Sequence, residues 1–256
     1  MAKVSLRSLE KAPRTDPPAG SSGTIETRAL FDRAGDPIHA HAHALAPGAA
    51  LQISGSPSDK VVYVWKGSVE GKGARLDAGS NIIAEYGATL TVTGGAEGAT
   101  LIEFGTATRL DYAGKGGHLH LLPADRVPRI GKTANLEIGS ALFADSRCPT
   151  CTVWLHETEM RNVDDPVDIH SHSEDELIFV TGGSIRLGNA IHGPGAALFV
   201  AADTNYGFST GPEGLSFINF RPSSPTYSSA DGKLVLNEAD FFIANVGKPQ
   251  FLELAD

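Results

Sequence analysis

Two histidines and a glutamate lie close together in the stretch DIHSHSEDELIFVTGG, which covers residues 168–183. His170 and His172 are separated by one residue, and Glu176 follows after three polar residues. Side chains at positions i and i+2 of a β-strand point to the same face, so both imidazoles can reach one point. Two neutral imidazoles and one carboxylate are the ligand set typical of non-haem iron. The stretch therefore predicts a metal site, with Fe²⁺ favoured and Mn²⁺, Ni²⁺, Cu²⁺ or Zn²⁺ also acceptable.

A second run of alternating histidines occurs in IHAHAHALAPG, but no glutamate follows it. On a strand, His39, His41 and His43 would present their imidazoles on one face, about 6 to 7 Å apart per step. Because no carboxylate completes a charge-balanced set, we interpret these histidines as polar residues of a barrel wall or a dimer surface, not as ligands of a physiological metal. The pair His118 and His120 is interpreted with the same caution.

The elements that must position these residues are short and β-like. Alternating or β-branched segments such as VVYVWKGSV and ELIFVTGGSIRLG are separated by glycine, proline and aspartate, and almost no segment has a helical stripe of apolar residues. Turn signals recur about every 8 to 12 residues, which is the spacing typical of β-sandwiches and jelly rolls. The pattern predicts an all-β fold.

The two halves of the chain resemble each other. Superimposing Gly67 on Gly183 places DKVVYVWKGSVEG over EDELIFVTGGSIRLG without a gap, and the same offset aligns the segments that follow. A duplicated β unit explains this match, and the first copy lacks the metal-binding side chains. The residues that align with His170, His172, Glu176 and Tyr206 are, in that order, Ser54, Ser56, Lys60 and Leu90.

A known family shares this spacing. The stretch from His170 to Gly183 resembles the first motif of the cupin superfamily, and the stretch from Gly188 through Pro194 to Phe208 resembles its second. With the repeat, the chain resembles a bicupin over most of residues 24–222. The resemblance implies two tandem cupin jelly-roll β-barrels, with a metal inside a barrel that is bound by two histidines, the glutamate and a third histidine from the second motif.

The repeat and the resemblance together imply a domain organisation. We expect a flexible N-terminal arm over residues 1–23, a degenerate cupin domain over 24–108, an inter-domain linker region over 109–140, a metal-binding cupin domain over 141–222 and a C-terminal tail over 223–256. The tail is expected to add a strand or a short helix that docks on the barrels. A homodimer is also expected, because pairing of barrels can cover sheet edges and apolar outer faces.

The sequence departs from the cupin pattern at two positions. Asp164 stands where the family usually has glycine, and Tyr206 stands where the third histidine is expected. A phenol is a weak metal ligand at neutral pH unless the metal lowers its pKa from about 10. Tyr206 is therefore a direct ligand, a hydrogen-bond partner of a metal-bound water, an acid or base near the substrate, or a packing residue; we favour a role at the site. His156 and His192 are the alternatives for the missing imidazole.

Further residues are expected to form a pocket around the metal. His156 shares its strand face with Trp154 and is either a ligand or a pocket wall, whereas His192 lies in a turn and is expected to face solvent. Arg221 either binds a substrate carboxylate by a two-point contact or forms a salt bridge at the barrel end. The expected pocket residues are Trp154, His156, Ile178, Phe208, Phe217 and Asn219, and the expected catalytic residues are Tyr206 and Arg221.

Composition excludes several classes of partner. The net charge is −9 with no basic cluster, which disfavours binding to nucleic acid or anionic lipid, and no apolar run approaches the roughly 20 residues of a membrane span. The first residues do not resemble a secretory signal, and the only two cysteines favour a reducing compartment, so we expect a cytoplasmic protein. Cys148 and Cys151 form CPTC, a redox pair or half of a zinc site; because strand-like residues follow, we interpret them as two semi-buried thiols.

These observations favour an enzyme that uses a metal to act on a small organic molecule, with Fe²⁺ dioxygenase chemistry as the first hypothesis. A redox-neutral lyase, isomerase or hydrolase is the close alternative, in which the metal is a Lewis acid and Tyr206 moves a proton. A binding or sensory protein without turnover is the alternative from another class. The absent fourth histidine and the degenerate first copy lend it weight.

Overall fold

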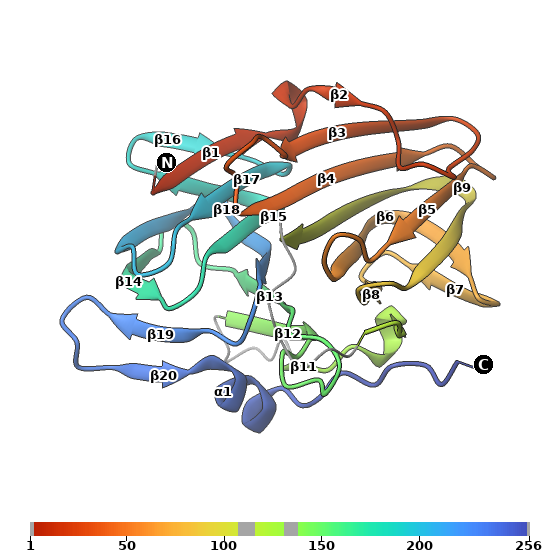
Figure 1. The fold of residues 1–256 in the computed structure, drawn as a ribbon. Helices are drawn as coiled ribbons and strands as arrows, with labels where there is room; N and C mark the ends of the chain where they lie inside the picture. Colours follow the sequence, from red (N-terminus) through yellow and green to blue (C-terminus); the bar gives the residue numbers. More distant parts are fainter. Residues whose placement is uncertain (1–2, 107–115, 131–137, 255–256) are drawn as a thin grey trace. The chain divides into compact units, whose positions relative to one another are not determined.

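The computed structural model describes residues 3–106, 116–130 and 138–254, and within them the chain is built mainly of β-strands (Figure 1). The described strands form two antiparallel sheets, one of eleven strands and one of nine, so the all-β prediction is confirmed. The chain divides into two compact units, which we describe separately. The N-terminal unit comprises Ala12–Val127, Cys148–Val153 and Pro249–Asp256, and the C-terminal unit comprises Met1–Lys11, Pro128–Arg147 and Trp154–Lys248.

The nine-stranded sheet belongs to the N-terminal unit. Its strands are β2 (Arg14–Thr15), β3 (Ile25–Phe31), β4 (Ile38–Leu45), β5 (Ala50–Ser54), β6 (Lys60–Gly71), β7 (Ala74–Asp77), β8 (Asn81–Ala84), β9 (Thr89–Thr106) and β10 (Leu119–Leu122). They follow the order β10-β8-β6-β9-β4-β3-β2, with β5 paired to β9 and β7 to β6. Buried residues at alternate positions, including Leu51, Ile53 and Val92, form the core of this unit. The 3-10 helix η2 (Ala124–Arg126) follows β10.

The eleven-stranded sheet belongs to the C-terminal unit. Its strands are β1 (Val4–Ser8), β11 (Arg129–Ile130), β12 (Ile138–Ala144), β13 (Trp154–Met160), β14 (Pro166–His172), β15 (Glu176–Leu187), β16 (Ala190–His192), β17 (Ala196–Val200), β18 (Tyr206–Arg221), β19 (Thr226–Ser229) and β20 (Val235–Asn237). The main order is β1-β17-β15-β18-β13-β12-β11, and β14 pairs with both β18 and β19. The unit also contains the 3-10 helix η1 (Leu9–Lys11) and the helix α1 (Glu238–Asn245).

The strands of the two sheets correspond at the offset seen in the sequence. Strands β6 and β15 each have 12 residues, and Lys60 at the start of β6 matches Glu176 at the start of β15. Gly67 and Gly183 both have positive φ values, of 71° and 60°, which an L side chain rarely adopts. Asp164 has a φ of 53°, and Gly48, which matches it at the same offset, has 74°; aspartate tolerates this left-handed backbone better than most residues.

The chain ends are more ordered than the sequence analysis predicts. Within the segment expected to be a flexible arm, β1 pairs with β17, and β2 pairs with β3. The prediction failed because a short alternating segment such as VSLRS becomes a strand only when another strand offers its open edge. In the expected linker, residues 109–115 and 131–137 lie outside the described residues, and β10 in the remainder pairs with β8.

The C-terminal tail contributes two strands and a helix to the C-terminal unit. β19 pairs with β14, β20 pairs with β19, and α1 follows directly, as Figure 1 shows. The side chain of Asn237 accepts a hydrogen bond of 3.0 Å from the backbone N–H of Asp240 and so caps α1. Within the described residues, no helix has the length and apolar character needed to cross a membrane.

Candidate metal centre

The C-terminal unit contains a cavity of about 470 Å³ with mainly apolar walls. His170, His172 and Tyr206 from the predicted site line it, together with Arg221. Of the predicted pocket residues, four line the cavity: His156, Phe208, Phe217 and Asn219. Trp154 and Ile178 do not line it. Trp154 packs in a small core beneath α1, and Ile178 is buried in the main core of the unit.

The two histidines of β14 are held so that one nitrogen of each ring remains available. Nδ1 of His170 donates to the backbone carbonyl of Asp168 over 2.6 Å, which leaves Nε2 as the ligand atom. Nδ1 of His172 lies 3.0 Å from Oε1 of Glu238, while its Nε2 lies 3.8 Å from Glu176. Burial lowers the pKa of His170, so its imidazole is neutral at neutral pH, which is the form that binds metals.

Glu176 is fully buried at the start of β15 and is held through one carboxylate oxygen. Oε2 accepts hydrogen bonds from Nδ2 of Asn219 over 2.9 Å and from Nη2 of Arg221 over 2.8 Å. Oε1 is buried without a hydrogen bond of good geometry. Burial opposes ionisation of Glu176, but the charge of Arg221 outweighs it and lowers the pKa of the carboxyl group. The result is a carboxylate with one oxygen still able to bind a cation.

Glu238, the first residue of α1, is a part of this site that the sequence analysis missed. Its Oε2 accepts a hydrogen bond of 2.6 Å from Nη1 of Arg221, and its Oε1 faces His172. Burial would raise the pKa of Glu238, but the charge of Arg221 and the contact with His172 lower it to about 2. Arg221 thus bridges two carboxylates, which is the salt-bridge alternative for this residue. Two carboxylates and one guanidinium leave a net charge of −1 at neutral pH, which favours a bound cation.

Tyr206 directly faces the histidines. It is the register partner of His170 across β14 and β18, and the centroids of the two rings are 4.5 Å apart. Burial and the negative charge of Glu176 raise the pKa of Tyr206 well above its usual range. The phenol therefore keeps its proton in this environment. Such a group suits hydrogen bonding or proton donation better than direct coordination as a phenolate.

Neither alternative histidine is placed as a fourth ligand. Nδ1 of His156 accepts a hydrogen bond of 2.8 Å from Trp154, so its other nitrogen carries the proton in the neutral ring. Burial and the charge of Arg221 lower the pKa of His156 to about 3, which keeps the ring neutral. His156 is therefore a wall residue. His192 lies on β16 and is not among the residues that line the cavity.

The ligand atoms fit a metal in type but are not gathered as tightly as in a closed site. In the part of the chain that the structure describes, two other groups of residues bring three or more ligand atoms within 4.8 Å of one another, and neither contains His170. The second oxygen of Glu176 is engaged by Arg221 and Asn219. Side-chain rotations are therefore needed for Nε2 of both histidines and Oε1 of Glu176 to meet at one ion.

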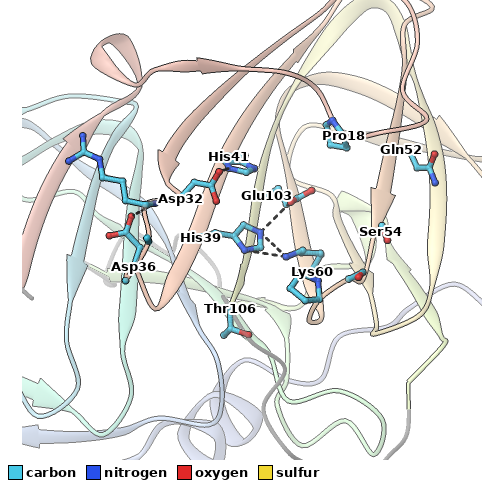
Figure 2. Close-up of a pocket in the computed structure, with 15 residues that line it drawn as sticks. Pro18, Asp32, Asp36, His39, His41, Gln52, Ser54, Lys60, Glu103 and Thr106 are labelled. Atoms are coloured by element: carbon cyan, nitrogen blue, oxygen red, sulfur yellow. Dashed lines mark hydrogen bonds and ion pairs between the residues drawn. The ribbon is translucent and has the colours of Figure 1, made fainter.

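The N-terminal unit has its own cavity of about 470 Å³, lined by polar side chains at the positions that match the metal motif (Figure 2). Ser54, Ser56 and Lys60 line it, as do His39 and His41. The matched positions therefore form a cavity in this unit as well. The chemistry differs because a lysine ammonium replaces the carboxylate of the motif.

A carboxylate does complete the histidine row of β4, contrary to our reading of the sequence. Glu103 on β9 is the register partner of His41, and its two oxygens lie 3.3 Å from His39 and 3.7 Å from His43. His41, His43 and Glu103 form one of the two groups with closely spaced ligand atoms. The error arose because Glu103 lies far from the histidines in the sequence. That the row binds no physiological metal stays a prediction.

Lys60 brings a buried positive charge to the same cavity. Its Nζ lies 2.9 Å from Nε2 of His39, and Figure 2 shows both residues beside Glu103. Burial lowers the pKa of Lys60, whereas the charge of Glu103 acts in the opposite direction. An ammonium group next to the histidine row repels a divalent cation, which agrees with the expectation that this unit is not the metal-binding one.

Comparison with known proteins shows which solved structures have a similar fold. No protein-family model matches the chain, and no curated protein matches it. Among solved structures, protein Ylba from E. coli is similar at a TM-score of 0.68, with 14% identity over 86% of this chain and 90% of that one. Oxalate decarboxylase from Lactobacillus farciminis in a formate complex is similar at 0.67, with 12% identity over 88% of each chain. A mutant of Bacillus subtilis oxalate decarboxylase is similar at 0.66, with 11% identity over 88% of this chain and 79% of that one.

These likenesses define the class of fold. The chain has an antiparallel, mainly β fold that is similar to the folds of these solved structures. Sequence identities of 11 to 14% support a similar fold but not a shared activity, so the chemistry of this chain must be argued from its own residues.

Proposed function

We propose that the chain is a bicupin whose C-terminal unit binds one divalent metal ion through His170, His172 and Glu176. The observation that carries the proposal is the pattern of free ligand atoms. In the two histidines, which line the cavity, Nδ1 faces a neighbouring group while Nε2 remains available; Glu176 is buried and does not line the cavity, and its Oε1 has no hydrogen bond of good geometry. Supporting contacts of this kind orient metal ligands in proteins and fix the histidine tautomers. Mn(II) centres are described in Bacillus subtilis oxalate decarboxylase, one of the proteins with a similar fold.

The cavity favours a small, largely apolar organic substrate. Phe208, Phe217 and Met160 form part of its wall and would exclude water from the reacting group. Arg221 is fully buried and engaged with two carboxylates, so a substrate carboxylate must compete with both to bind it. The two-point role predicted for Arg221 is therefore less favourable than the role of holding Glu176 and Glu238.

We propose dioxygenase chemistry with Fe²⁺ as the first assignment. The ion would supply a Lewis acid and a centre for one-electron chemistry with dioxygen at positions left open by three protein ligands. Tyr206, whose hydroxyl contacts Glu176, would donate a hydrogen bond at the site, because its raised pKa keeps the proton in place. Glu176 and the histidines hold the site, and the apolar wall keeps water out.

A redox-neutral reaction is the second candidate, and the state of Tyr206 favours it. A neutral phenol at the cavity can donate a proton to a substrate carbanion or leaving group, and the charge of Arg221 can stabilise the phenolate that this leaves. Lyase, isomerase and hydrolase reactions need such an acid and no dioxygen. A binding or sensory protein, which has the same site without turnover, remains the alternative from another class.

Oxygen uptake separates these candidates. Protein reconstituted with Fe²⁺ should be mixed with a panel of small carboxylic acids, phenols and diketones, while dioxygen and products are measured in air and under nitrogen. Turnover in air with one dioxygen consumed per product supports the dioxygenase. Equal turnover under nitrogen assigns the redox-neutral class, and saturable binding without any product assigns a sensor.

The assembly and the compartment follow the same proposal. We propose a homodimer in the cytoplasm that acts on a small molecule. The compartment rests on the chain's two cysteines, and the dimer on sheet edges and apolar outer faces that pairing of barrels can cover.

A further inference from the structure

Four ligand-type side chains converge in the N-terminal unit, outside the cavity of Figure 2. They are Glu85, His120, Cys148 and Cys151, and each has a ligand atom within 4.8 Å of the ligand atoms of the other three. Glu85 follows directly after β8, and His120 lies on β10, the strand paired with β8. The two cysteines come from the segment Cys148–Val153, which packs with this unit. Three separate parts of the sequence therefore meet at one point.

The group is held together through Glu85. This carboxylate is fully buried; Oε1 lies 2.7 Å from Nε2 of His120 and also accepts from the hydroxyl of Thr150, and Oε2 accepts from the backbone N–H of His118 over 3.2 Å. Thr150 in turn lies 3.3 Å from Sγ of Cys148.

The donor atoms of the group are those of a structural zinc site. Two sulfurs, one imidazole nitrogen and one carboxylate oxygen lie within 4.8 Å of one another, and Nε2 of His120 pairs with Oε1 of Glu85. Thiolate, imidazole and carboxylate are the ligands that zinc takes in such sites.

A redox disulfide is the main alternative for the two cysteines, and the local structure disfavours it. Both cysteines are free. Reactive CxxC pairs lie at the start of a helix, which lowers the pKa of the first thiol, whereas residues 148–153 are irregular and lead into β13. A redox pair also has no need of an adjacent buried glutamate and histidine.

We propose that Glu85, His120, Cys148 and Cys151 bind a zinc ion that fixes the segment Cys148–Val153 to the sheet of the N-terminal unit. Two cysteines in the spacing C-x₂-C, one imidazole and one carboxylate supply four ligands, the number of a closed structural zinc site. Thiolate ligands favour zinc, whereas manganese prefers sites made of oxygen ligands. Thr150 and the backbone of His118 act as the outer contacts that orient Glu85.

Cobalt spectroscopy tests this site independently of the one in the C-terminal unit. The full chain carrying His172→Ala should be reduced, stripped with a chelator and titrated with Co²⁺. Thiolate ligands give a sulfur-to-cobalt charge-transfer band, and a tetrahedral site gives intense visible bands; a site of histidines and carboxylates gives no sulfur band. We expect one Co²⁺ per chain with the sulfur band, and its displacement by one equivalent of Zn²⁺.

Two variants complete the test. Cys151→Ser should abolish the sulfur band and lower zinc content by one ion per chain, whereas His118→Ala should leave both unchanged, because only its backbone contacts Glu85. Absence of a sulfur band in the reduced parent would overturn the proposal even if the variants fail to fold. A disulfide between Cys148 and Cys151 in protein purified under reducing conditions would overturn it as well.

Discussion

Glu238 provides a sharp test of how the metal centre is organised, because it is not a proposed ligand but contacts the proposed ligand His172 and Arg221. Glu238→Gln keeps the size of the side chain and removes its charge. The net charge of the carboxylate and guanidinium groups then changes from −1 to zero, and His172 loses the carboxylate that lies 3.0 Å from its Nδ1. Loss of an outer contact of this kind costs about 10- to 100-fold in metal affinity. That range corresponds to about 1.4 to 2.7 kcal/mol of binding free energy.

The same substitution should lower stability, with a pH dependence that can be worked out in advance. The pKa of Glu238 is about 2 in the folded protein, against about 4.3 in an unfolded chain. The depressed value stabilises the fold at any pH above about 4.3, by about 3 kcal/mol, and this contribution is lost as the pH falls toward 2. The free energy of unfolding should therefore differ between parent and Glu238→Gln at pH 7 and converge in acid.

Calorimetric titration with Mn²⁺ and urea unfolding measure the two effects. Asp240→Asn is the matched control, because Asp240 lies in the same helix and pairs with exposed Arg147 instead of the metal centre. Manganese affinities for Glu238→Gln and Asp240→Asn that agree within twofold would refute the reasoning that Glu238 orients His172. A stability difference that does not shrink in acid would refute the assigned pKa.

Three further predictions follow from the remaining features. Tyr206→Phe should keep the metal and reduce turnover, since a neutral phenol is not a required ligand; loss of metal together with a phenolate-to-iron absorption band would show the opposite. Burial lowers the pKa of Lys60 in the folded protein, so the unfolded chain binds more protons between the folded pKa and about 10.4. The free energy of unfolding should therefore rise with pH in this range. Urea unfolding at pH 8 and pH 10 should show this rise in the parent but not in Lys60→Met. Light scattering should give twice the chain mass of 26.8 kDa, and a monomer at micromolar concentration would contradict the dimer.

The β fold could be predicted from the sequence, because the patterns that indicate it involve residues close together in the chain. Alternation and glycine turns predicted the β architecture, and the match of Gly67 with Gly183 predicted that β6 and β15 correspond. The strand β1 was missed because its partner, the edge of β17, lies almost two hundred residues away.

The parts of the sites that escaped prediction are those assembled over long sequence separations. Glu103 reaches the histidine row of β4 from β9, and Glu238 reaches His172 from α1. Neither has a fixed spacing from its partners, so no pattern in the sequence singles it out. The group around Glu85 had one usable signal, the C-x₂-C spacing of Cys148 and Cys151, but its histidine and glutamate come from other segments.

The central claim is that the C-terminal unit, and not the histidine row of β4, holds the functional metal. Titration of metal-free protein with Mn²⁺ tests it most directly, because manganese prefers oxygen and nitrogen ligands to the sulfur-containing group around Glu85. We predict one Mn²⁺ per chain in the parent, none in His172→Ala, and one in His41→Ala. Binding that survives His172→Ala and disappears in His41→Ala would contradict the account.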